Sequence, residues 1–579
     1  MIQVKDHKTG YLFDPWGFLG KKRRKLMDKS WAGLFREKIL CELPVGEFAK
    51  SFSEEYGRPT KELYAVLGTL ILQQMLDLSD DETIEQFAFN LQWHYALDIM
   101  STDESETYMC PRTLWGMRDL VIGKGLDGVL FNEVTAILAE SFDVDASKQR
   151  IDSVHIRSNM RRLGRIRIFV QTINKFLVNL KRQHKELFDT LPEEMVHKYE
   201  SEKALSAFSL VKPSMASNTL EKLSKDLFDL GQRFSDNEEV LSMSSYGLIL
   251  RVLEEQCIIT KDPKGKPQEV AVRSAKEVPS DSLQNPSDVD ATYDGHKGQG
   301  YQVQVMETYT EDKDETTLNL ITHVEVEPSH KSDVHALIPA IESAQDRGLG
   351  PQEVLADSLY GSDDNHEQAQ KMGVELVAPC MGESRDESLS LADFECNHHG
   401  RIIKCPGGHA PVSHKIKKDR HNVRFALDAC TACPHRLQCP VQKGKKNFYL
   451  RYTTKAMRID RRRKSEHTDE FIDKYRYRAG VEATMSEYNT LTGVKRLRVR
   501  GMEAVRYCAT LKAIGVNIFR ATAVRRALMP SFDSFSHHIE CFLSKIYRFA
   551  TKFGLIISHC MKYTPDNDLG PDTQPIYAL

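Results

Sequence analysis

The sequence predicts an α/β protein in which a mixed sheet with covering helices follows a helical amino-terminal region. Three observations lead to this fold class. Apolar residues recur at helix spacing between Lys61 and Leu126, short apolar or alternating runs between Arg150 and Val377 are typical of strands, and helical patterns separate those runs. The length of 579 residues and the apolar fraction of 41% allow several domains and a large core, which excludes global disorder.

The amino-terminal helices come first. One helical face is indicated by Leu63, Val66, Leu67, Leu70 and Ile71. Ser79 followed by Glu82 forms a capping-box pattern that begins the next helix, and a further helix is expected after Pro111. Several short helices ahead of an α/β body suit a helix-turn-helix-like DNA-recognition module, although a plain structural bundle has the same spacing. We expect this helical domain to span residues 1–140.

The α/β body begins with a strand over residues 150–156, and a helical stretch over 168–285 interrupts it. Polar, proline-containing sequence at 261–299 is expected to form an exposed connection. The order is then strand, strand, helix, strand, helix, strand and, after a cysteine-rich segment, helix. Strands are expected at 301–305, 324–327, 354–357 and 374–377, and helices at 333–347 and 468–526. Alternation in the first two of these strands predicts that they are half-buried and antiparallel.

Charge is unevenly distributed along the chain. The formal net charge is only −3, yet residues 451–530 carry 19 Lys or Arg against 8 Asp or Glu, which suits contact with a phosphate backbone. No apolar run reaches the roughly 20 residues that a bilayer span needs, so we expect no membrane role. Because the first residues lack the layout of a signal peptide, we expect a cytoplasmic protein, associated with the nucleoid when bound to DNA.

Two aspartates are candidates for a catalytic centre. Asp152 lies in the first strand and Asp357 closes a later buried strand, where an unpaired charge is costly. If these strands are neighbours in the sheet, the two carboxylates lie side by side. Their repulsion would then be relieved by a divalent cation.

Glu482 is the third candidate. On the basic helix expected around it, Tyr475, Arg478, Glu482 and Asn489 share one face, because they are three, four and seven positions apart. Three carboxylates suit phosphodiester cleavage and transfer, in which two Mg²⁺ (or Mn²⁺) ions about 4 Å apart activate the nucleophile and stabilise the leaving oxygen. Arg478 would hold a phosphate or orient Glu482. Aspartates at strand ends and glutamates on basic helices are also common structural features, so spacing alone leaves both readings open.

These residues resemble those of a known family. Tyr475, Arg478 and Glu482 match Tyr-x2-Arg-x3-Glu of the Tyr-Arg-Glu-Lys signature found in DDE transposases of bacterial insertion sequences. Segments 57–80, 151–153, 300–303 and 355–361 also resemble that family, so the resemblance covers about residues 40 to 525. The signature's final lysine is replaced by Asn489, and Lys495 and Arg496 are candidates to make its phosphate contact.

The resemblance implies an RNase H-like core with a mixed five-stranded sheet in the order β-β-β-α-β-α-β-α. It implies that Asp152 on the first strand, Asp357 after the fourth and Glu482 on the last helix bind two Mg²⁺ ions. The core would span 145–525, interrupted by the helical insertion at 168–285 and by a small, zinc-ribbon-like cysteine-rich insertion at 385–447. Residues 526–579 match nothing and are treated as a tail of unknown role.

Other carboxylates near the core elements are interpreted as structural: Asp290, Asp294, Asp333, Asp363, Asp364 and Glu487. The first two fall in a loop before a strand. Asp333 lies near a helix start, where a carboxylate caps free backbone amides.

The cysteine-rich insertion offers a second metal site. Four thiolates, enough for one tetrahedral Zn²⁺ ion, are supplied by Cys405, Cys430, Cys433 and Cys439. Alternative ligands are Cys396, His398, His399 and His409. Similar insertions occur in the transposases that this chain resembles, which favours structural zinc over a 4Fe–4S cluster. Reduced thiols packed as small hydrophobic groups are the remaining alternative.

The resemblance implies a transposase that cleaves the ends of an insertion sequence and joins the freed 3′-hydroxyl to target DNA. Its partners would be double-stranded DNA, as terminal inverted repeats and as target, and a second copy of the chain, since two ends must be held together. A host-serving nuclease with the same core is one alternative. A zinc-stabilised DNA-binding protein without catalysis is another, and Asn489 in place of lysine is the feature that favours it.

Overall fold

The computed structural model describes residues 2–529 except 10, 54, 56, 264, 313, 383–388, 398 and 399. Most of the tail set apart at 526–579 therefore lies outside the described residues, as do the two alternative ligands His398 and His399. The chain divides into two units, 1–522 and 523–579. Every contact described below lies within the first unit.

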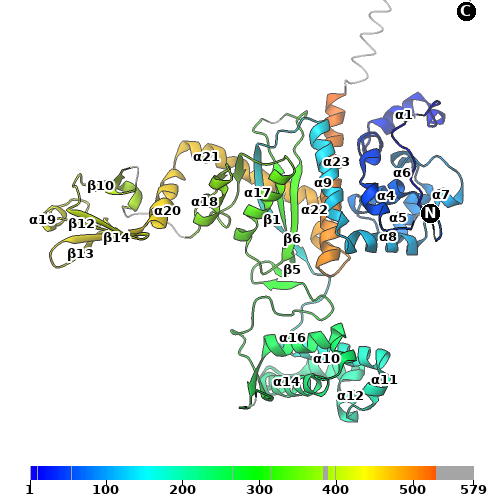
Figure 1. Cartoon of the computed structure of the whole chain (residues 1–579), viewed down its shortest axis with the longest axis horizontal. Coiled ribbons are helices and arrows are strands. Elements are labelled where there is room, and N and C mark those ends of the chain that lie inside the picture. The colour runs from blue at the N-terminus through cyan, green and yellow to red at the C-terminus, as the bar shows by residue number, and fades with distance from the viewer. Residues whose placement is uncertain are drawn as a thin grey trace, which may run out of the picture. The chain divides into compact units, whose positions relative to one another are not determined.

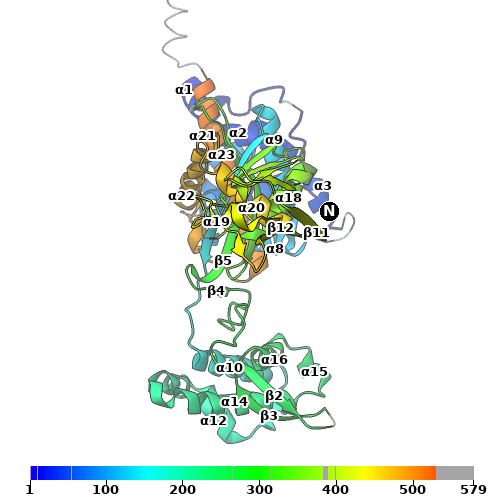
Figure 2. The same cartoon turned by 90° about the vertical axis from the view of Figure 1, so that its left-hand side faces the viewer.

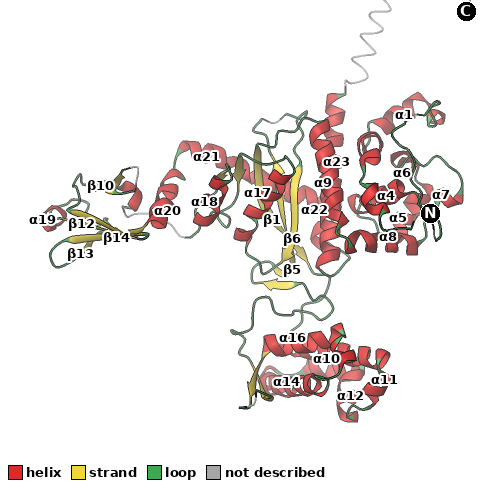
Figure 3. Cartoon of the chain, viewed as in Figure 1, coloured by secondary structure: helices red, strands yellow, loops and turns green. Residues whose placement is uncertain are grey.

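A mixed sheet forms the centre of the α/β body (Figures 1 and 3). Its strands are β4 (Thr292–Asp294), β5 (Gly298–Thr308), β1 (Lys148–Arg157), β7 (Glu353–Leu355) and β8 (Glu375–Val377) in spatial order, with β6 (Ile321–Pro328) also paired to β5. β1 is antiparallel to β5 and parallel to β7, and β7 is parallel to β8. This mixed α/β architecture fits an RNase H-like domain.

The sheet has six strands, so the expected number of five was wrong. The additional strand, β4, pairs only with Gly298–Gly300 at the start of β5. It forms because Asp294 Oδ1 accepts hydrogen bonds from the backbone amides of His296 and Lys297, which closes a tight turn. A three-residue strand of this kind has no hydrophobic alternation, so its sequence reads as a loop.

β5 is buried on both faces, whereas its alternation predicted a half-buried strand. Gln302 and Gln304, the polar residues of that alternation, are fully buried. One face of the sheet packs against α17 (Leu337–Asp346) and α18 (Asp363–Lys371). The glutamines tolerate burial because both make side-chain hydrogen bonds: Gln302 Nε2 donates to the Lys331 carbonyl and Gln304 Nε2 donates to Asp333 Oδ1.

The opposite face of the sheet carries the carboxyl-terminal helices. α21 (Asp469–Tyr475) is followed by a 3₁₀ turn at Arg476–Ala479 and then by α22 (Gly480–Thr492). Aromatic side chains of α21 and of the turn pack on Leu355 and Val377. α23 (Met502–Leu528) follows as the longest helix of the described chain.

The amino-terminal region is helical, with α4 (Leu63–Met75), α5 (Asp80–Phe89), α8 (Pro111–Gly123) and α9 (Leu126–Ser141) as its main helices. Ser79 and Glu82 form the predicted capping box at the start of α5. α4 packs tightly on α23, because a Cβ added at Gly515 would lie 2.8 Å from the Met75 backbone. In the part of the chain that the structure describes, no helix is long and apolar enough to cross a membrane.

The segment between β1 and β4 forms a helical module with its own apolar core (Figure 2). Its main helices are α10 (Arg165–Gln183), α14 (Ala216–Arg233) and α16 (Ser244–Gln256). The expected exposed connection at 261–299 begins instead with a hairpin of β2 (Cys257–Lys261) and β3 (Pro267–Val272). The hairpin is ordered because Val270 and Ile259 pack against the helical core.

The cysteine-rich segment contains a small sheet as well as loops. The strand order is β11 (Ser413–Lys417), β12 (Arg420–Phe425), β14 (Phe448–Thr453) and β13 (Gln442–Lys443). Val423, Phe425, Phe448 and Leu450 form its core. α20 (Thr454–Ser465) leads from this sheet back toward the α/β body.

Candidate active site

The pairing of β1 with β7 brings the two candidate aspartates together. Arg150 lies opposite Leu355 in parallel register, and the same register two residues later sets Asp152 beside Asp357. Both side chains are mostly but not fully buried, with 16% and 27% of their surfaces exposed. They lie two residues beyond the last paired residues of β1 and β7, where β7 has ended and β1 continues, and solvent can reach both side chains.

α22 brings Glu482 to the same place from another part of the chain. Glu482 lies in the first turn of the helix, and its side chain is 70% exposed. The helix start fits closely against β1, since a Cβ added at Gly480 would lie 2.0 Å from the Arg150 guanidinium. Any larger residue at position 480 would displace either the helix or Arg150.

Arg478 connects all three carboxylates. Its Nη2 atom lies 2.8 Å from Asp152 Oδ2 and 3.8 Å from Asp357 Oδ2, and its Nη1 atom lies 3.2 Å from Glu482 Oε1. Asp152, Asp357 and Glu482 therefore surround one guanidinium group. This arrangement concentrates negative charge at a single point, where cations and phosphate-bound metals are favoured.

Among the three carboxyl groups, Asp152 has a raised pKa. Burial raises the pKa of Asp152 to about 6, and the neighbouring carboxylates of Asp357 and Asp333 add to the shift, while the Arg478 charge opposes it. Burial also raises the pKa of the Tyr475 phenol, which feels the same aspartates. Additional positive charge at this point would therefore stabilise the ionised aspartates.

The single helix that was expected to carry the four signature residues on one face is interrupted. Tyr475 ends α21, Arg478 lies in the 3₁₀ turn at Arg476–Ala479, and Glu482 and Asn489 lie on α22. Tyr475 stacks on Phe471 at a ring distance of 5.5 Å. Asn489 lies farther along α22, where its Oδ1 accepts a hydrogen bond of 3.2 Å from the Lys495 amide. Lys495 and its neighbour Arg496 are exposed.

A buried polar layer behind the aspartates was not predicted from the sequence. Gln304 Nε2 donates to Asp333 Oδ1 at 2.7 Å, and the Tyr360 hydroxyl donates to Gln304 Oε1 at 2.6 Å. Lys297 Nζ donates to Ser153 Oγ at 3.2 Å and lies 3.4 Å from Asp333 Oδ2. Asp333 thus binds side chains of this layer and does not cap the following helix, so the expected capping role was wrong.

A second group of buried charges anchors α22, the helix that carries Glu482. Glu307 on β5 is fully buried and accepts hydrogen bonds from Arg150 Nε at 2.7 Å, Thr484 Oγ1 at 2.7 Å and Arg520 Nη1 at 2.8 Å. Arg150 also donates to the Tyr477 carbonyl at 2.8 Å. Strand β1, strand β5 and helices α22 and α23 therefore meet at one carboxylate. A charged residue within an otherwise apolar strand was the only sequence signal for it.

The carboxylates interpreted as structural have other partners. Asp290 accepts from the Met502 amide, and Asp363 binds Arg458 and Arg462 of α20. The remaining members of that set also have partners: Asp294 in its turn, Asp364 with Lys455, and Glu487 with Arg520.

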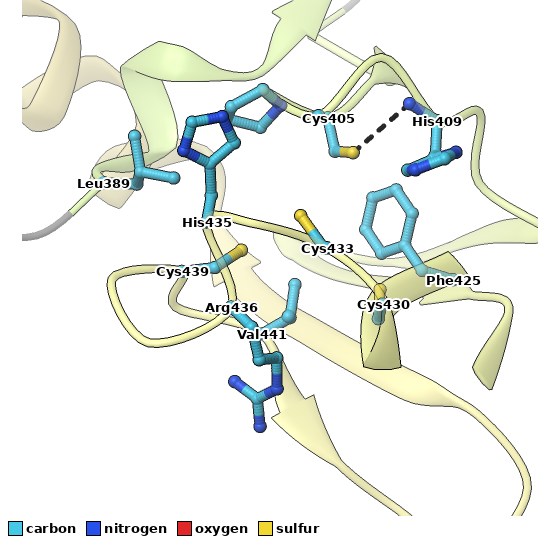
Figure 4. A pocket seen from close by; sticks show the side chains of 12 residues that line it. Leu389, Cys405, His409, Phe425, Cys430, Cys433, His435, Arg436, Cys439 and Val441 are labelled. Atoms are coloured by element: carbon cyan, nitrogen blue, oxygen red, sulfur yellow. Dashed lines mark hydrogen bonds between the residues drawn. The ribbon is translucent and has the colours of Figure 1, made fainter. Parts of the chain in front are cut away.

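The four candidate zinc ligands line one small cavity of about 20 Å³ in the cysteine-rich segment (Figure 4). This space holds about one water-sized sphere or ion. The backbone amide of His409 donates to Cys405 Sγ at 3.4 Å. Burial and the other three cysteines raise the pKa of Cys430 to about 11. Cys396 does not line the cavity, whereas His409 does.

No three His, Cys, Asp or Glu side chains among the described residues are arranged as a ready-made metal site, either here or at the aspartates. The donor chemistry nevertheless fits at both places. Four thiols around an ion-sized cavity suit zinc, and three carboxylates at a partly exposed edge suit magnesium.

Comparison with known proteins gives two family matches. Residues 404–522 match a family described as Transposase DDE domain, and residues 33–120 match one described as Transposase domain (DUF772). The first range contains Glu482 and the four cysteines, and the second contains α4 to α7 and most of α8. No curated protein matches the chain.

Proposed function

As the chain is a DDE-type transposase of the insertion-sequence kind, we propose that it cleaves the ends of its DNA element and joins the freed 3′-hydroxyl to target DNA. The observation that carries this mechanism is the meeting of Asp152, Asp357 and Glu482 around Arg478. Three carboxylates from two strands and a distant helix have no structural need to share one guanidinium.

Asp152, Asp357 and Glu482 are the residues that would hold divalent cations, Mg²⁺ or Mn²⁺. Two such cations, when bound, activate the attacking water or 3′-hydroxyl and stabilise the leaving oxygen. Asp152 is held in place by β1 and Asp357 lies two residues after β7, whereas Glu482 is largely exposed and can adjust its position. Arg478 neutralises part of the charge of the three carboxylates and would be placed to bind a phosphate.

Other residues would hold the DNA. Lys495 and Arg496 are exposed beside α22, and Asn489 fixes the backbone of Lys495. They supply the phosphate contact that Asn489 itself, lacking a charge, cannot make. The amino-terminal helices, within the first 140 residues, would recognise the terminal inverted repeats. A dimer on DNA would hold the two ends together.

The cysteine cluster would bind one structural Zn²⁺ ion through Cys405, Cys430, Cys433 and Cys439. The support is their shared ion-sized cavity and the amide-to-sulfur hydrogen bond at Cys405. Thiolates are the favoured state once zinc binds, which offsets the raised pKa of Cys430. A small segment with a limited apolar core gains stability from such a metal.

The test is nicking of duplex DNA that carries the element's inverted repeats, with Mg²⁺ or Mn²⁺ present. Asp152→Ala, Asp357→Ala and Glu482→Ala are each expected to reduce nicking at least about 100-fold, while DNA binding is kept. Glu342→Ala, a change at an exposed glutamate of α17, is the matched control and should cut normally. Unchanged cutting in any one of the three alanine variants removes that residue from the site.

One residue favours a second candidate, a DNA-binding protein or nuclease that does not join strands. Asn489 replaces the lysine of the signature, so position 489 itself lacks the charge that makes the phosphate contact in the resembled transposases. Gel analysis of the products separates the two. Joined products support transposition, whereas nicked products alone support a nuclease.

A further inference from the structure

The cysteine-rich segment is strongly basic, apart from any metal it binds. Residues 401–451 contain 12 Lys or Arg and 2 Asp or Glu. Zinc binding explains four cysteines but none of these cations. The proposed active site lies on other elements, so it does not explain them either.

Many of these cations lie on one face of the small sheet. β11, β12 and β14 pair in register, with Lys417 opposite Arg420, Lys415 opposite Asn422, and Asn422 opposite Arg451. Residues directly opposite each other share a face. The basic face is defined here by Lys415, Lys417, Arg420, Arg424 and Arg451. The other face carries the apolar core.

Two cations of the basic face repel each other in the folded protein. Lys417 and Arg420 are both exposed and stand directly opposite each other, and like charges in that position repel. No carboxylate among the described residues lies within ion-pair distance of either one; the ion pairs nearest in sequence are Lys404 with Glu395 and Lys455 with Asp364. A polyanion on this face would remove the repulsion.

The dimensions of the face suit a nucleic-acid backbone. With strands about 4.8 Å apart and alternate residues about 6.7 Å apart, three strands spread the cations over roughly 10 by 13 Å. That is close to the major-groove width of about 12 Å that separates phosphate rows in B-DNA. Lys445 and Lys446, exposed in the loop between β13 and β14, extend the charge beyond the sheet.

The segment is also tied to the proposed active site. α20 follows β14 directly, and its Arg458 and Arg462 bind Asp363 at 2.6 and 2.7 Å. Asp363 begins the helix that follows Asp357. DNA held on the basic face would therefore be attached to the element that follows one catalytic aspartate.

We propose that the basic face of β11, β12 and β14 binds the phosphate backbone of duplex DNA, as a contact separate from the acidic centre. The proposal rests on the proposed function for the identity of the polyanion. Contacts to phosphates carry no sequence information, so we expect binding by this face to be independent of sequence. Its affinity therefore depends steeply on salt.

The experiment measures binding of the full chain, loaded with zinc, to a 40-base-pair duplex of random sequence between 50 and 300 mM salt. The variant combines Lys415→Gln, Lys417→Gln and Arg420→Gln. We expect at least about a tenfold loss of affinity at 100 mM salt and a fall of about 2.7 in the magnitude of the salt slope, because each phosphate contact contributes about 0.9. Thermal unfolding and zinc content should match the wild type.

The matched control removes the same charge elsewhere, with Lys185→Gln, Lys203→Gln and Lys222→Gln on exposed positions of the helical module. The salt slope of its duplex affinity should lie within about one of the wild-type value. A second measurement places the photo-crosslinking residue p-benzoylphenylalanine at Asn422, in the middle of the face, and should yield a covalent adduct with the duplex. Crosslinking does not depend on the stability of the triple variant.

Four outcomes would overturn the inference: an unchanged salt slope in the triple variant, an equal loss in the control, absence of the crosslink, or more than tenfold tighter binding of duplex RNA. Nicking of inverted-repeat DNA is scored separately. If the wild-type protein nicks inverted-repeat DNA and the triple variant binds the random duplex as tightly as the wild type, this inference is refuted and the proposed catalysis stands. If duplex binding depends on the basic face but the wild-type protein never nicks inverted-repeat DNA, the proposed catalysis is refuted and this inference stands.

Discussion

Arg478 illustrates how much a single residue determines at this site, since it lies within 4 Å of three carboxylates. Its charge lowers the pKa of Asp152, which is about 6 with Arg478 in place. Arg478→Gln removes that effect, so the pKa of Asp152 rises further. Nicking at pH 7 should then fall, and the rising limb of the pH–rate profile should move to higher pH.

The measurement is the nicking rate from pH 5 to pH 9 at fixed Mg²⁺ concentration. Arg478→Lys keeps a positive charge but loses the forked geometry, so it should shift the profile less than Arg478→Gln. Identical profiles for both variants and the wild type would show that Arg478 does not influence Asp152.

Thr484 makes a different contribution, because it lies two residues after Glu482 and donates to the buried carboxylate of Glu307. Thr484→Val preserves the shape of the side chain but removes this hydrogen bond, at a cost of about 1–3 kcal/mol of unfolding free energy. If the bond holds Glu482 in position, the Mg²⁺ concentration for half-maximal nicking also rises.

Denaturant unfolding and Mg²⁺ titration of nicking check this prediction together. Ser486→Ala, at an exposed position of the same helix, is the control and should change neither quantity. A loss of stability with an unchanged Mg²⁺ requirement would limit Thr484 to a structural role.

The irregular segment at the start of the chain contacts the amino-terminal helices through a titratable group, His7. His7 lies 3.3 Å from Asp98 and 3.7 Å from Glu62. Burial disfavours its charged form, but the two carboxylates outweigh burial and raise the pKa of His7 to about 9. The stabilisation is therefore complete below about pH 6.5 and is lost as the pH rises through 9, by about 3 kcal/mol in total.

The check is the difference in unfolding free energy between the wild type and His7→Gln from pH 6 to pH 10. The difference should be largest at pH 6 and shrink toward pH 10. A difference that stays constant would show that His7 is not charged in the folded protein.

The cysteine-rich element should depend on its metal. Each chain is expected to contain one zinc ion, and Cys430→Ser or removal of zinc by a chelator should expose residues 401–451 to proteolysis, because the sheet loses the metal that supports it. Metal analysis and limited proteolysis measure this. Ser substitution at Cys110, an unrelated cysteine on the amino-terminal helices, should change neither. Iron in place of zinc would instead indicate a cluster.

Sequence patterns predict the features of the fold and the site that local chemistry determines, and they miss the features that tertiary packing determines. Asp357 can be identified because a charge that closes an apolar strand requires a reason, and Asp152 because it lies within a strand expected beside it. Glu482 needs the family resemblance, since a glutamate on a basic helix is common. Gln304 reads as a solvent-facing residue of an alternating strand, and Glu307 falls beyond the end of the expected strand at 301–305. Their burial arises from helices that cover both faces of the sheet.

The junction between the amino-terminal helices and the α/β body depends on one buried lysine. Lys512 of α23 is 2% exposed and donates to the Gln74 carbonyl, to Asp77 Oδ1 at 2.7 Å and to the Thr492 carbonyl at the end of α22. The helices proposed to recognise DNA ends and the helix that carries Glu482 thus share one ammonium group. Lys512→Met fills the same space but leaves three acceptors without their donor.

We expect Lys512→Met to lower the unfolding free energy by about 3 kcal/mol and to separate two activities that the wild type couples. Binding of inverted-repeat DNA should be largely kept, because the amino-terminal helices remain folded, while nicking per bound complex falls. Arg498→Gln, which removes an exposed partner of the same Asp77, is the matched control with a much smaller effect. Equal losses of binding and nicking would instead mean that Lys512 only supports the fold, since a junction that transmits end recognition must affect cutting more than binding.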